Sequence, residues 1–133
     1  MKKIFVCSPY HGDIEANTKV AKFAAKIISC TDDLPIAPHL YFPQFLDEND
    51  PYKRILGIKL GVELLKECDC LWIVGTKITT GMEYELNAAR EHHIPVWLYD
   101  EQLNRIAPDT LLLDDRLSAD YRRIVTSLTL YKF

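Results

Sequence analysis

The sequence predicts an α/β fold: a three-layer flavodoxin-like or Rossmann-like domain with a mostly parallel sheet of four or five strands. Short apolar runs, rich in β-branched and aromatic residues, alternate along the chain with longer segments of helical periodicity. This alternation favours parallel strands joined by right-handed crossovers. A chain of 133 residues suits one domain, so we expect residues 1–133 to share a single core.

Composition and charge exclude several classes of partner. The chain is 48% hydrophobic and 26% charged, which is ordinary for a soluble globular protein. Its formal net charge of −3 offers no electrostatic footprint for a nucleic acid polymer or an anionic membrane. No apolar run reaches about 18 residues, and the apolar stretch near the N-terminus is too short for a signal peptide. We therefore expect a cytoplasmic protein without membrane or nucleic-acid partners.

The cysteines do not predict a metal site. Three of the four flank or occupy apolar segments, where cysteine usually serves as a small buried hydrophobe. A Cys-x-Cys pair at Cys68 and Cys70 lacks a second ligand pair, and His92 and His93 are adjacent rather than spaced for zinc. We expect neither a metal ion nor another cofactor.

The first strand and helix form half of a βαβ unit. Residues 2–8 predict a central strand, the following SPYHGD segment is a turn with Gly12, and Asp13 caps a helix that runs to about Cys30. Amides of such a loop at a helix N-terminus can hold an anion. An ordinary connection is the simpler interpretation, because neither a dinucleotide fingerprint nor a Walker loop is present.

Residues 34–37 predict a second strand, and His39 follows in the turn at its end. The next segment, residues 40–50, is aromatic and irregular, as expected of a loop that covers a pocket. A satellite hydrophobic cluster is the alternative. His39 can donate to a ligand, although a turn histidine is more often structural.

Asp50 and Pro51 predict the start of a helix that runs to about Glu67. This helix carries two apolar stripes. One suits packing on the sheet: Ile55, Ile58, Val62 and Leu65. The other lies on a different face and predicts a subunit contact, or burial under the aromatic loop: Leu56, Leu60 and Leu64.

The stretch from residue 68 to 89, CDCLWIVGTKITTGMEYELNAA, organises the rest of the chain. Residues 70–74 predict a buried strand with Asp69 at its entrance and Gly75 at its end. After a loop at residues 76–80, a helical pattern begins at Gly81. The end of a strand therefore lies beside the start of a helix, where open α/β sheets place ligand sites.

Helical spacing predicts different roles for the two glutamates of that helix. With Thr80 as N-cap, Glu83 falls at the third helical position and completes a capping box, which gives it a structural role. Glu85 instead lies beside Met82 and Leu86, at the margin of the face that packs on the sheet. A carboxylate there is costly without a partner or a purpose, so Glu85 is the better candidate for a working group.

The remaining elements complete the sheet and its cover. The helix ends within residues 92–95, and residues 96–99 predict a further strand. The loop at residues 101–115 contains a short strand at 111–113, and Ser118 caps a last helix. Parallel connections bring the ends of the strands, with Ser8, His39 and Gly75, to one edge of the sheet and one cleft.

Several segments together resemble the small nucleoside 2-deoxyribosyltransferase-like proteins. They are SPYHGD with Asn17, PIAPHLYFPQFLD, RILGIKLGVELLKECD, LWIVG and TTGMEYELNAA, within residues 1–99. The resemblance implies cleavage or transfer of the N-glycosidic bond of a (deoxy)nucleoside or nucleoside 5′-monophosphate. It also implies a homo-oligomer whose neighbouring subunits help to close the site. A nucleotide-binding module of the same fold, without turnover, is the alternative.

The resemblance implies roles for particular residues. Glu85, in Glu-Leu-Asn-Ala-Ala, matches the nucleophile of the family, although Asn87 replaces the usual glycine and alignment on Gly81 would select Glu83. Asp69 matches an aspartate associated with the base or sugar. The substrate-binding residues are expected to be Ser8, Gly12, His39, Gly75, Thr80, Gly81 and Met82.

The expected chemistry explains the need for carboxylates. Breaking the N-glycosidic bond creates an oxocarbenium-like centre, which an ionised Glu85 would stabilise or capture. We expect Asp69 to supply the proton to the departing base and Tyr10 to orient Glu85 by a hydrogen bond. Water as acceptor would make the protein a hydrolase, and a second base would make it a transferase.

Overall fold

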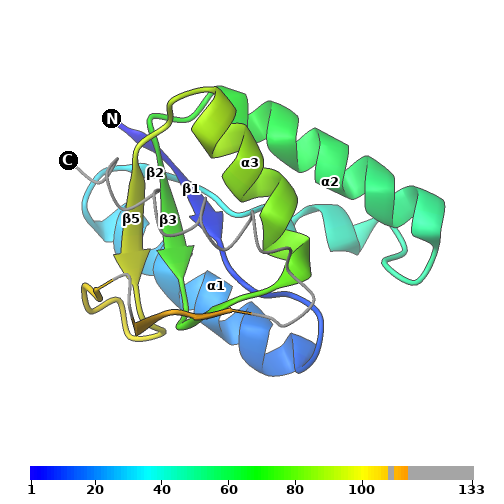
Figure 1. The fold of residues 1–133 in the computed structure, drawn as a ribbon, viewed down its shortest axis with the longest axis horizontal. Helices are drawn as coiled ribbons and strands as arrows, with labels where there is room; N and C mark the ends of the chain where they lie inside the picture. The colour runs from blue at the N-terminus through cyan, green and yellow to red at the C-terminus, as the bar shows by residue number, and fades with distance from the viewer. Residues whose placement is uncertain (108–109, 114–133) are drawn as a thin grey trace.

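The computed structural model describes residues 1–107 and 110–113 of the chain. Four parallel strands form the main sheet in the order β2-β1-β3-β5 (Figure 1). They are β1 (Lys3–Cys7), β2 (Leu34–Ile36), β3 (Cys70–Val74) and β5 (Val96–Tyr99). The predicted α/β class and the parallel sheet are confirmed. The predicted last helix, capped by Ser118, lies outside the described residues.

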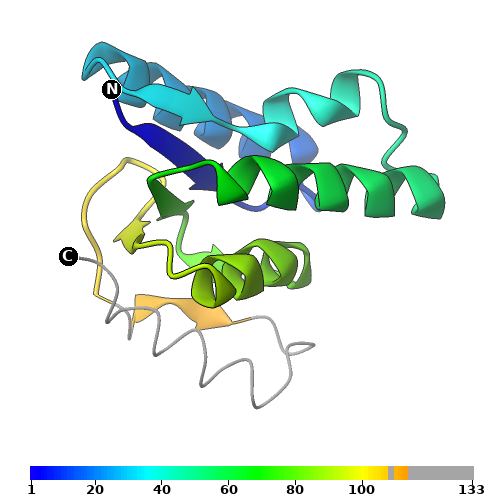
Figure 2. The ribbon, with the colours of Figure 1, turned by 90° about the horizontal axis from the view of Figure 1, so that it is seen from above.

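Helices cover both faces of the sheet, which makes the three layers that were predicted (Figures 1 and 2). Ala24 and Ile28 of the first helix pack with Ile4 and Val6 of β1 on one face. The other face meets the second and third helices through residues such as Leu65. The helices are α1 (Ile14–Cys30), α2 (Pro51–Lys66) and α3 (Glu83–Glu91).

The alternation of side chains along β1 sorts its residues between the two faces. Phe5 and Cys7 are fully buried in the cluster that includes α3, whereas Ile4 and Val6 face α1. Because β1 pairs in parallel with both β2 and β3 and helices cover both faces of the sheet, it is buried on all sides and reads as a continuous apolar run. The last residue of the strand, Cys7, and the following Ser8 are therefore buried at the carboxyl edge.

Two of the predicted N-caps are confirmed. The side chain of Asp13 accepts a hydrogen bond from the amide of Ala16 at 3.1 Å. Asp50 accepts from the amide of Tyr52 at 3.0 Å, with Pro51 as the first residue of α2. These side chains satisfy amides that have no partner within the helix, and they fix where each helix begins.

The start of α3 differs from the predicted capping box. A 3₁₀ turn, η3 (Thr80–Met82), precedes the helix, and Thr79 rather than Thr80 is the residue before that turn. The amide of Thr79 donates to the sulfur of Met82 at 3.4 Å. Glu83 is the first residue of α3, so its predicted capping role with Thr80 is wrong. The tighter turn moves the start by one residue, a shift that helix spacing alone does not reveal.

The apolar stripes of α2 are only partly buried. Leu65 is fully buried, but Ile55, which was expected to pack on the sheet, is exposed. Leu56 and Leu60 of the other stripe are 44% and 36% exposed. The N-terminal half of α2 projects beyond the strands, so only its C-terminal half reaches the sheet (Figures 1 and 2).

Short elements complete the described chain. The predicted strand near residues 111–113 is confirmed as β6 (Leu112–Leu113), and it pairs in parallel with β4 (Lys77–Ile78), which was expected to be loop. The aromatic segment forms two 3₁₀ turns, η1 (Pro38–Leu40) and η2 (Phe42–Gln44). Among the described helices, none has the length and apolar character needed to cross a bilayer.

Candidate functional site

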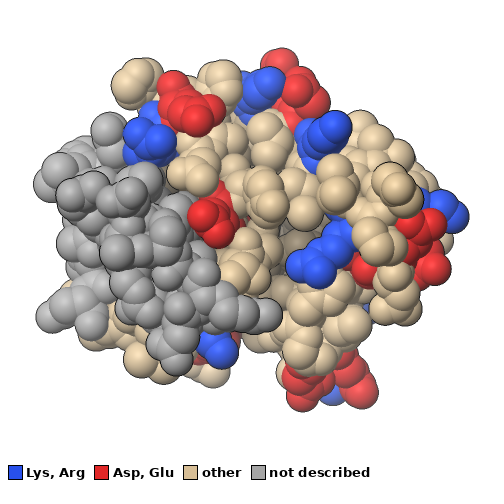
Figure 3. Space-filling model, turned by 45° about the vertical axis from the view of Figure 1, so that its right-hand side comes forward, with Lys and Arg blue, Asp and Glu red and all other residues tan. Residues whose placement is uncertain are grey.

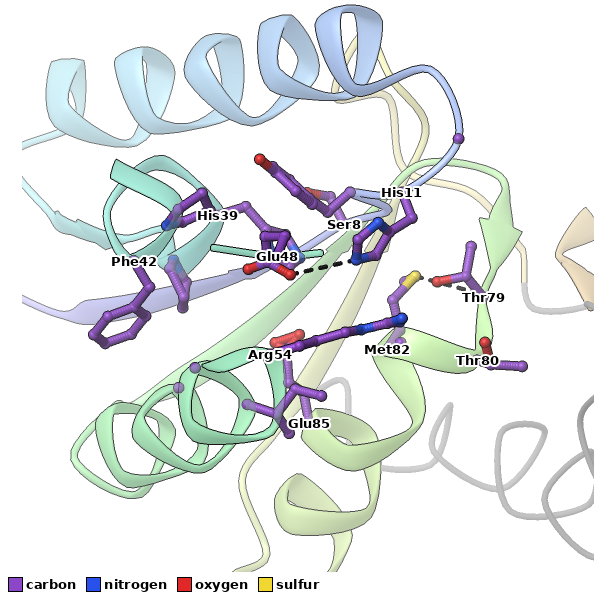
Figure 4. A pocket seen from close by; sticks show the side chains of 18 of the residues that line it. Ser8, His11, His39, Phe42, Glu48, Arg54, Thr79, Thr80, Met82 and Glu85 are labelled. Atoms are coloured by element: carbon purple, nitrogen blue, oxygen red, sulfur yellow. Dashed lines mark hydrogen bonds and ion pairs between the residues drawn. The ribbon is translucent and has the colours of Figure 1, made fainter. Parts of the chain in front are cut away.

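A cavity of about 440 Å³ lies at the carboxyl edge of the sheet, within the size range of small-molecule sites. Its walls come from the loop after β1, the η1–η2 segment, α2, and the loop that leads into α3 (Figure 4). Most of the residues singled out in the sequence line it: Ser8, Tyr10, Gly12, His39, Thr80, Gly81, Met82 and Glu85. The parallel topology thus brings together residues that are far apart in the chain.

Glu85 is buried at this cavity, with 7% of its surface exposed. Its neighbours on the helix, Met82, Leu86 and Ala89, are core residues, as the helical spacing predicted. The thiol of Cys7, at the end of β1, is hydrogen-bonded to the Glu85 carboxyl group. A carboxyl group held between the core and a cavity is the arrangement that the sequence argument required.

Burial raises the pKa of Glu85 to about 8, although the hydrogen bond from Cys7 opposes this shift. The same burial, with the charge of Glu85 nearby, raises the pKa of the Cys7 thiol. In the free protein at neutral pH, Glu85 is therefore mostly protonated rather than ionised as expected. Ionising it requires a higher pH or a cationic group close to its carboxyl group.

Asp69 lies at the opposite edge of the sheet. It precedes β3, and its carboxylate accepts a hydrogen bond from the amide of Lys3 at 2.7 Å. It is not among the residues that line the cavity. The expected position of Asp69 beside the sugar or base is wrong, because parallel strands enter at one edge and leave at the other. Asp69 instead ties the start of β3 to the start of β1.

Tyr10 lines the cavity but does not orient Glu85. Its ring stacks on that of His39, with centroids 5.0 Å apart and planes at 26°. Burial, and then the charge of Glu48, raise the pKa of Tyr10. Among the described residues, Cys7 is the one hydrogen-bonded to Glu85. Tyr10 and His39 therefore form an aromatic wall at the cavity.

His39 is held as a neutral imidazole. Burial lowers the pKa of His39 to about 4, although its hydrogen bond to the Ser8 backbone works in the opposite direction. The proximity of His11 lowers the pKa of His39 further. The histidine therefore fixes the β1–α1 loop against η1 and offers an uncharged ring to a ligand.

Ser8 offers an unused polar group. Its side chain is 1% exposed, it lines the cavity, and its hydroxyl oxygen has no hydrogen-bond partner within the described residues. A buried hydroxyl without a partner is costly. A ligand with a polar group at this position would remove that cost.

Gly75 does not line the cavity. It has a φ of +122°, a conformation that glycine adopts without strain, and its amide donates to the carbonyl of Tyr99 at 2.8 Å. Gly75 therefore bends the chain out of β3 and does not contact a ligand there. Gly12, with a φ of +101°, makes the corresponding bend in the loop after β1 and does line the cavity.

Four charged or titratable residues that line the cavity were not among the predicted site residues: His11, Glu48, Arg54 and Lys77. Nε2 of His11 lies 3.3 Å from Oε2 of Glu48, which joins the loop after β1 to the segment before α2 across the cavity (Figure 4). Arg54 reaches the cavity from the first turn of α2. The sequence around residues 11–13 and 47–50 predicted only turns. The spacing of residues within a loop does not show which other loop it contacts.

The described residues contain no group of three or more histidine, cysteine, aspartate or glutamate side chains that could hold a metal. Charges on the face shown in Figure 3 are interspersed, and they form no broad patch of one sign among the coloured residues. Recognition at the cavity therefore depends on a few local groups rather than on a strong overall field.

Comparisons with known proteins agree with the fold. The model of a family described as "Domain of unknown function (DUF7768)" matches residues 2–99. No curated protein matches the chain. Among solved structures, it is similar to a 2-deoxyribosyltransferase from the psychrotolerant bacterium Bacillus psychrosaccharolyticus, with 18% identity and a TM-score of 0.62. That alignment covers 98% of this chain and 93% of the other.

Proposed function

The chain belongs to the DUF7768 family, whose description assigns no activity, and we propose that it cleaves or transfers an N-glycosidic bond. The substrate is a (deoxy)nucleoside or nucleoside 5′-monophosphate. The observation that carries this proposal is Glu85, an acidic side chain held in the wall of a cavity at the carboxyl edge of the sheet. The solved structure of similar fold is described as a 2-deoxyribosyltransferase, which agrees with it.

In the proposed reaction, the carboxylate of Glu85 attacks the anomeric carbon as the bond to the base breaks, and the departing base takes its proton from water. Water or a second base then takes the sugar from Glu85. Because burial raises the pKa of Glu85 to about 8, the reactive carboxylate is the minor form at neutral pH. The rate of sugar transfer should therefore rise with pH until it levels off above about 8.

The other cavity residues bind the substrate in this proposal. Tyr10 and His39 present the aromatic wall against which a sugar or base can pack. The hydroxyl of Ser8 supplies a hydrogen bond deep in the cavity, and the backbone around Gly12, Thr80 and Gly81 lets the ligand approach closely. Asp69 and Gly75 have no part in it, because neither lines the cavity.

Substitution of Glu85 tests the proposed reaction. Wild-type protein incubated with a panel of deoxynucleosides and their monophosphates, with and without a second base, should yield free base or exchanged nucleoside on chromatography. Glu85→Gln should lower this rate at least about 1,000-fold, because the amide cannot act as the nucleophile.

The matched control is Glu91→Gln, an exposed glutamate near the end of the same helix, which should retain the wild-type rate. Equal activity of the Glu85→Gln and wild-type proteins would refute the assignment. Loss of activity in the Glu83→Gln protein alone would assign the reaction to the neighbouring glutamate.

A binding module without turnover is the second candidate. The raised pKa of Glu85 favours it, because a protonated carboxyl group is a hydrogen-bond donor and not a nucleophile. Ligand-induced thermal stabilisation, without base release at any pH between about 6 and about 9.5, would support this alternative over the enzyme.

The proposal also includes a homo-oligomer. Exposed apolar residues gather on the part of α2 that projects beyond the sheet, beside the cavity: Tyr52, Ile55, Leu56 and Leu60. Exposed apolar side chains grouped on one part of a helix are typical of a protein contact. A second copy on this face would lie close to the site, as the resemblance implies.

A further inference from the structure

The charged groups of the cavity do not cancel. Glu48 is paired with His11 at 3.3 Å, and Glu85 is buried and mostly protonated at neutral pH. Arg54 also lines the cavity and is partly buried, yet no carboxylate lies within 4.0 Å of it in the described part of the chain. Lys77 also lines the cavity. Two basic side chains, Arg54 and Lys77, therefore face Glu48 and the mostly neutral Glu85, so the cavity carries excess positive charge.

Arg54 is directed across the cavity toward the turn that leads into α3. Its side chain extends from α2 across the cavity toward η3 (Figure 4). A Cβ atom built on Gly81 would lie 3.9 Å from Nη2 of Arg54, so the guanidinium group lies over the turn that leads into α3. The guanidinium group therefore faces the space between α2 and this turn.

The unpartnered hydroxyl of Ser8 independently indicates a polar ligand. Ser8 belongs to a different wall of the cavity from Arg54 (Figure 4). A ligand that spans the cavity would meet a buried hydroxyl on one side and a cation on the other. Tyr10, His39 and Phe42 supply aromatic surface between loops of the same cavity. This combination matches a compact molecule with an aromatic ring, hydroxyl groups and one anionic end.

We propose that the substrate is a nucleoside 5′-monophosphate whose phosphate is bound by Arg54. This inference rests on the proposed function and adds the class of substrate. A phosphate accepts two parallel hydrogen bonds from one guanidinium group, which makes Arg54 selective for it over a neutral 5′-hydroxyl. Arg54 is then a specificity-determining residue that does not take part in bond breaking.

The test compares a deoxynucleoside with its 5′-monophosphate. In the wild-type protein, kcat/KM for base release should be higher for the monophosphate. Arg54→Gln should lower the ratio of the two kcat/KM values at least about tenfold, the usual loss for a charged hydrogen bond. Arg54→Lys keeps the positive charge but lacks the planar guanidinium group. Its ratio of the two kcat/KM values should lie between those of the wild type and Arg54→Gln.

The control is Lys59→Gln, which removes one positive charge from the exposed side of α2 without touching the cavity. Its ratio should equal that of the wild type. A ratio unchanged in the Arg54→Gln protein, or lowered equally by Lys59→Gln, overturns the inference. Wild-type preference for the unphosphorylated nucleoside also overturns it.

A binding measurement separates this inference from the proposed reaction. Calorimetric titration of Glu85→Gln protein with the monophosphate requires no turnover. The Glu85→Gln protein should bind the monophosphate more tightly than the nucleoside. The double variant with Arg54→Gln should bind the two ligands with similar affinity. If the wild type releases no base but binding depends on Arg54, the reaction is refuted and the anion site is supported. If base is released without dependence on Arg54, the anion site is refuted and the reaction stands.

Discussion

At the scale of single residues, the surroundings of Glu85 set the protonation state on which its proposed reaction depends. The side chain is buried against Met82 and Leu86 and meets the thiol of Cys7. Burial favours its neutral form, whereas nucleophilic attack needs the ionised form. Stability and reactivity therefore oppose each other at this one position, as expected for a functional site.

The raised pKa of Glu85 predicts a stability that depends on pH. Between about pH 4.5 and 8 the unfolded chain has released this proton but the folded protein retains it. Fewer protons are then bound in the unfolded state, so the free energy of unfolding falls as pH rises, by up to about 1.4 kcal/mol per pH unit from this group. Glu85→Gln should therefore gain stability relative to the wild type as pH rises through this range.

Urea unfolding at several pH values across this range measures the difference. The comparison cancels the contribution of His39, whose lowered pKa of about 4 has the opposite effect: it makes stability rise with pH between about 4 and 6.5. Glu91→Gln, at an exposed position, should show a constant difference from the wild type. A constant difference for Glu85→Gln too would mean that its carboxyl group titrates normally.

At the scale of elements, the two halves of α2 have different roles. Its C-terminal half packs through Leu65 on the sheet. Its N-terminal half supplies Arg54 and Ile58 to the cavity and exposes hydrophobic side chains such as Leu56. The side chain of Pro38 lies beside Gly61, with its Cβ 3.8 Å from the position where a Cβ of Gly61 would lie. A Cβ there would make ordinary van der Waals contact, so α2 lies close to the η1–η2 segment without requiring glycine at this position.

The exposed stripe on α2 predicts the effect of charge on assembly. If Leu56 and Leu60 form a subunit contact, Leu56→Glu with Leu60→Glu should dissociate the oligomer, since charges at an apolar contact are strongly unfavourable. Light scattering coupled to size exclusion measures the mass, and circular dichroism checks folding. Lys26→Glu, at an exposed position of α1 on the other side of the sheet, is the control and should leave the mass unchanged. A monomeric wild type would refute the contact.

At the scale of the whole molecule, the parallel sheet converts distant segments into one site. Strands in the order β2-β1-β3-β5 bring the ends of β1, β2 and β3 to one edge. The cavity therefore takes residues from the loop after β1, the η1–η2 segment, α2 and the loop before α3. Ligand binding should couple these segments and stabilise the fold as a unit.

Thermal unfolding tests that coupling. A nucleoside 5′-monophosphate at about 100 times its dissociation constant should add about 2.7 kcal/mol to the free energy of unfolding of the Glu85→Gln protein. The midpoint temperature should rise accordingly with ligand concentration. Adding Arg54→Gln to the Glu85→Gln protein should reduce this rise in midpoint temperature, whereas adding Lys59→Gln should not. Unchanged midpoints with every nucleoside and nucleotide would exclude this cavity as their binding site.

Sequence patterns predicted the elements well where local rules dominate. Alternating apolar runs located the four strands of the main sheet, and Asp13 and Asp50 marked helix starts through interactions within three residues. The start of α3 was misplaced, because the 3₁₀ turn and the Thr79–Met82 contact follow no simple spacing. The exposure of Ile55 was missed, since periodicity does not show how far a helix extends past its sheet.

By itself, the sequence determined the α/β class, the chain of elements and the placement of Glu85 on a face turned toward the core. Those follow from periodicity and from contacts between near neighbours in the chain. Only the tertiary structure decided which residues share the cavity. It moved Asp69 to the far edge, joined Cys7 to Glu85, and brought His11, Glu48 and Arg54 together. Such encounters depend on strand direction and loop packing, which no local spacing encodes.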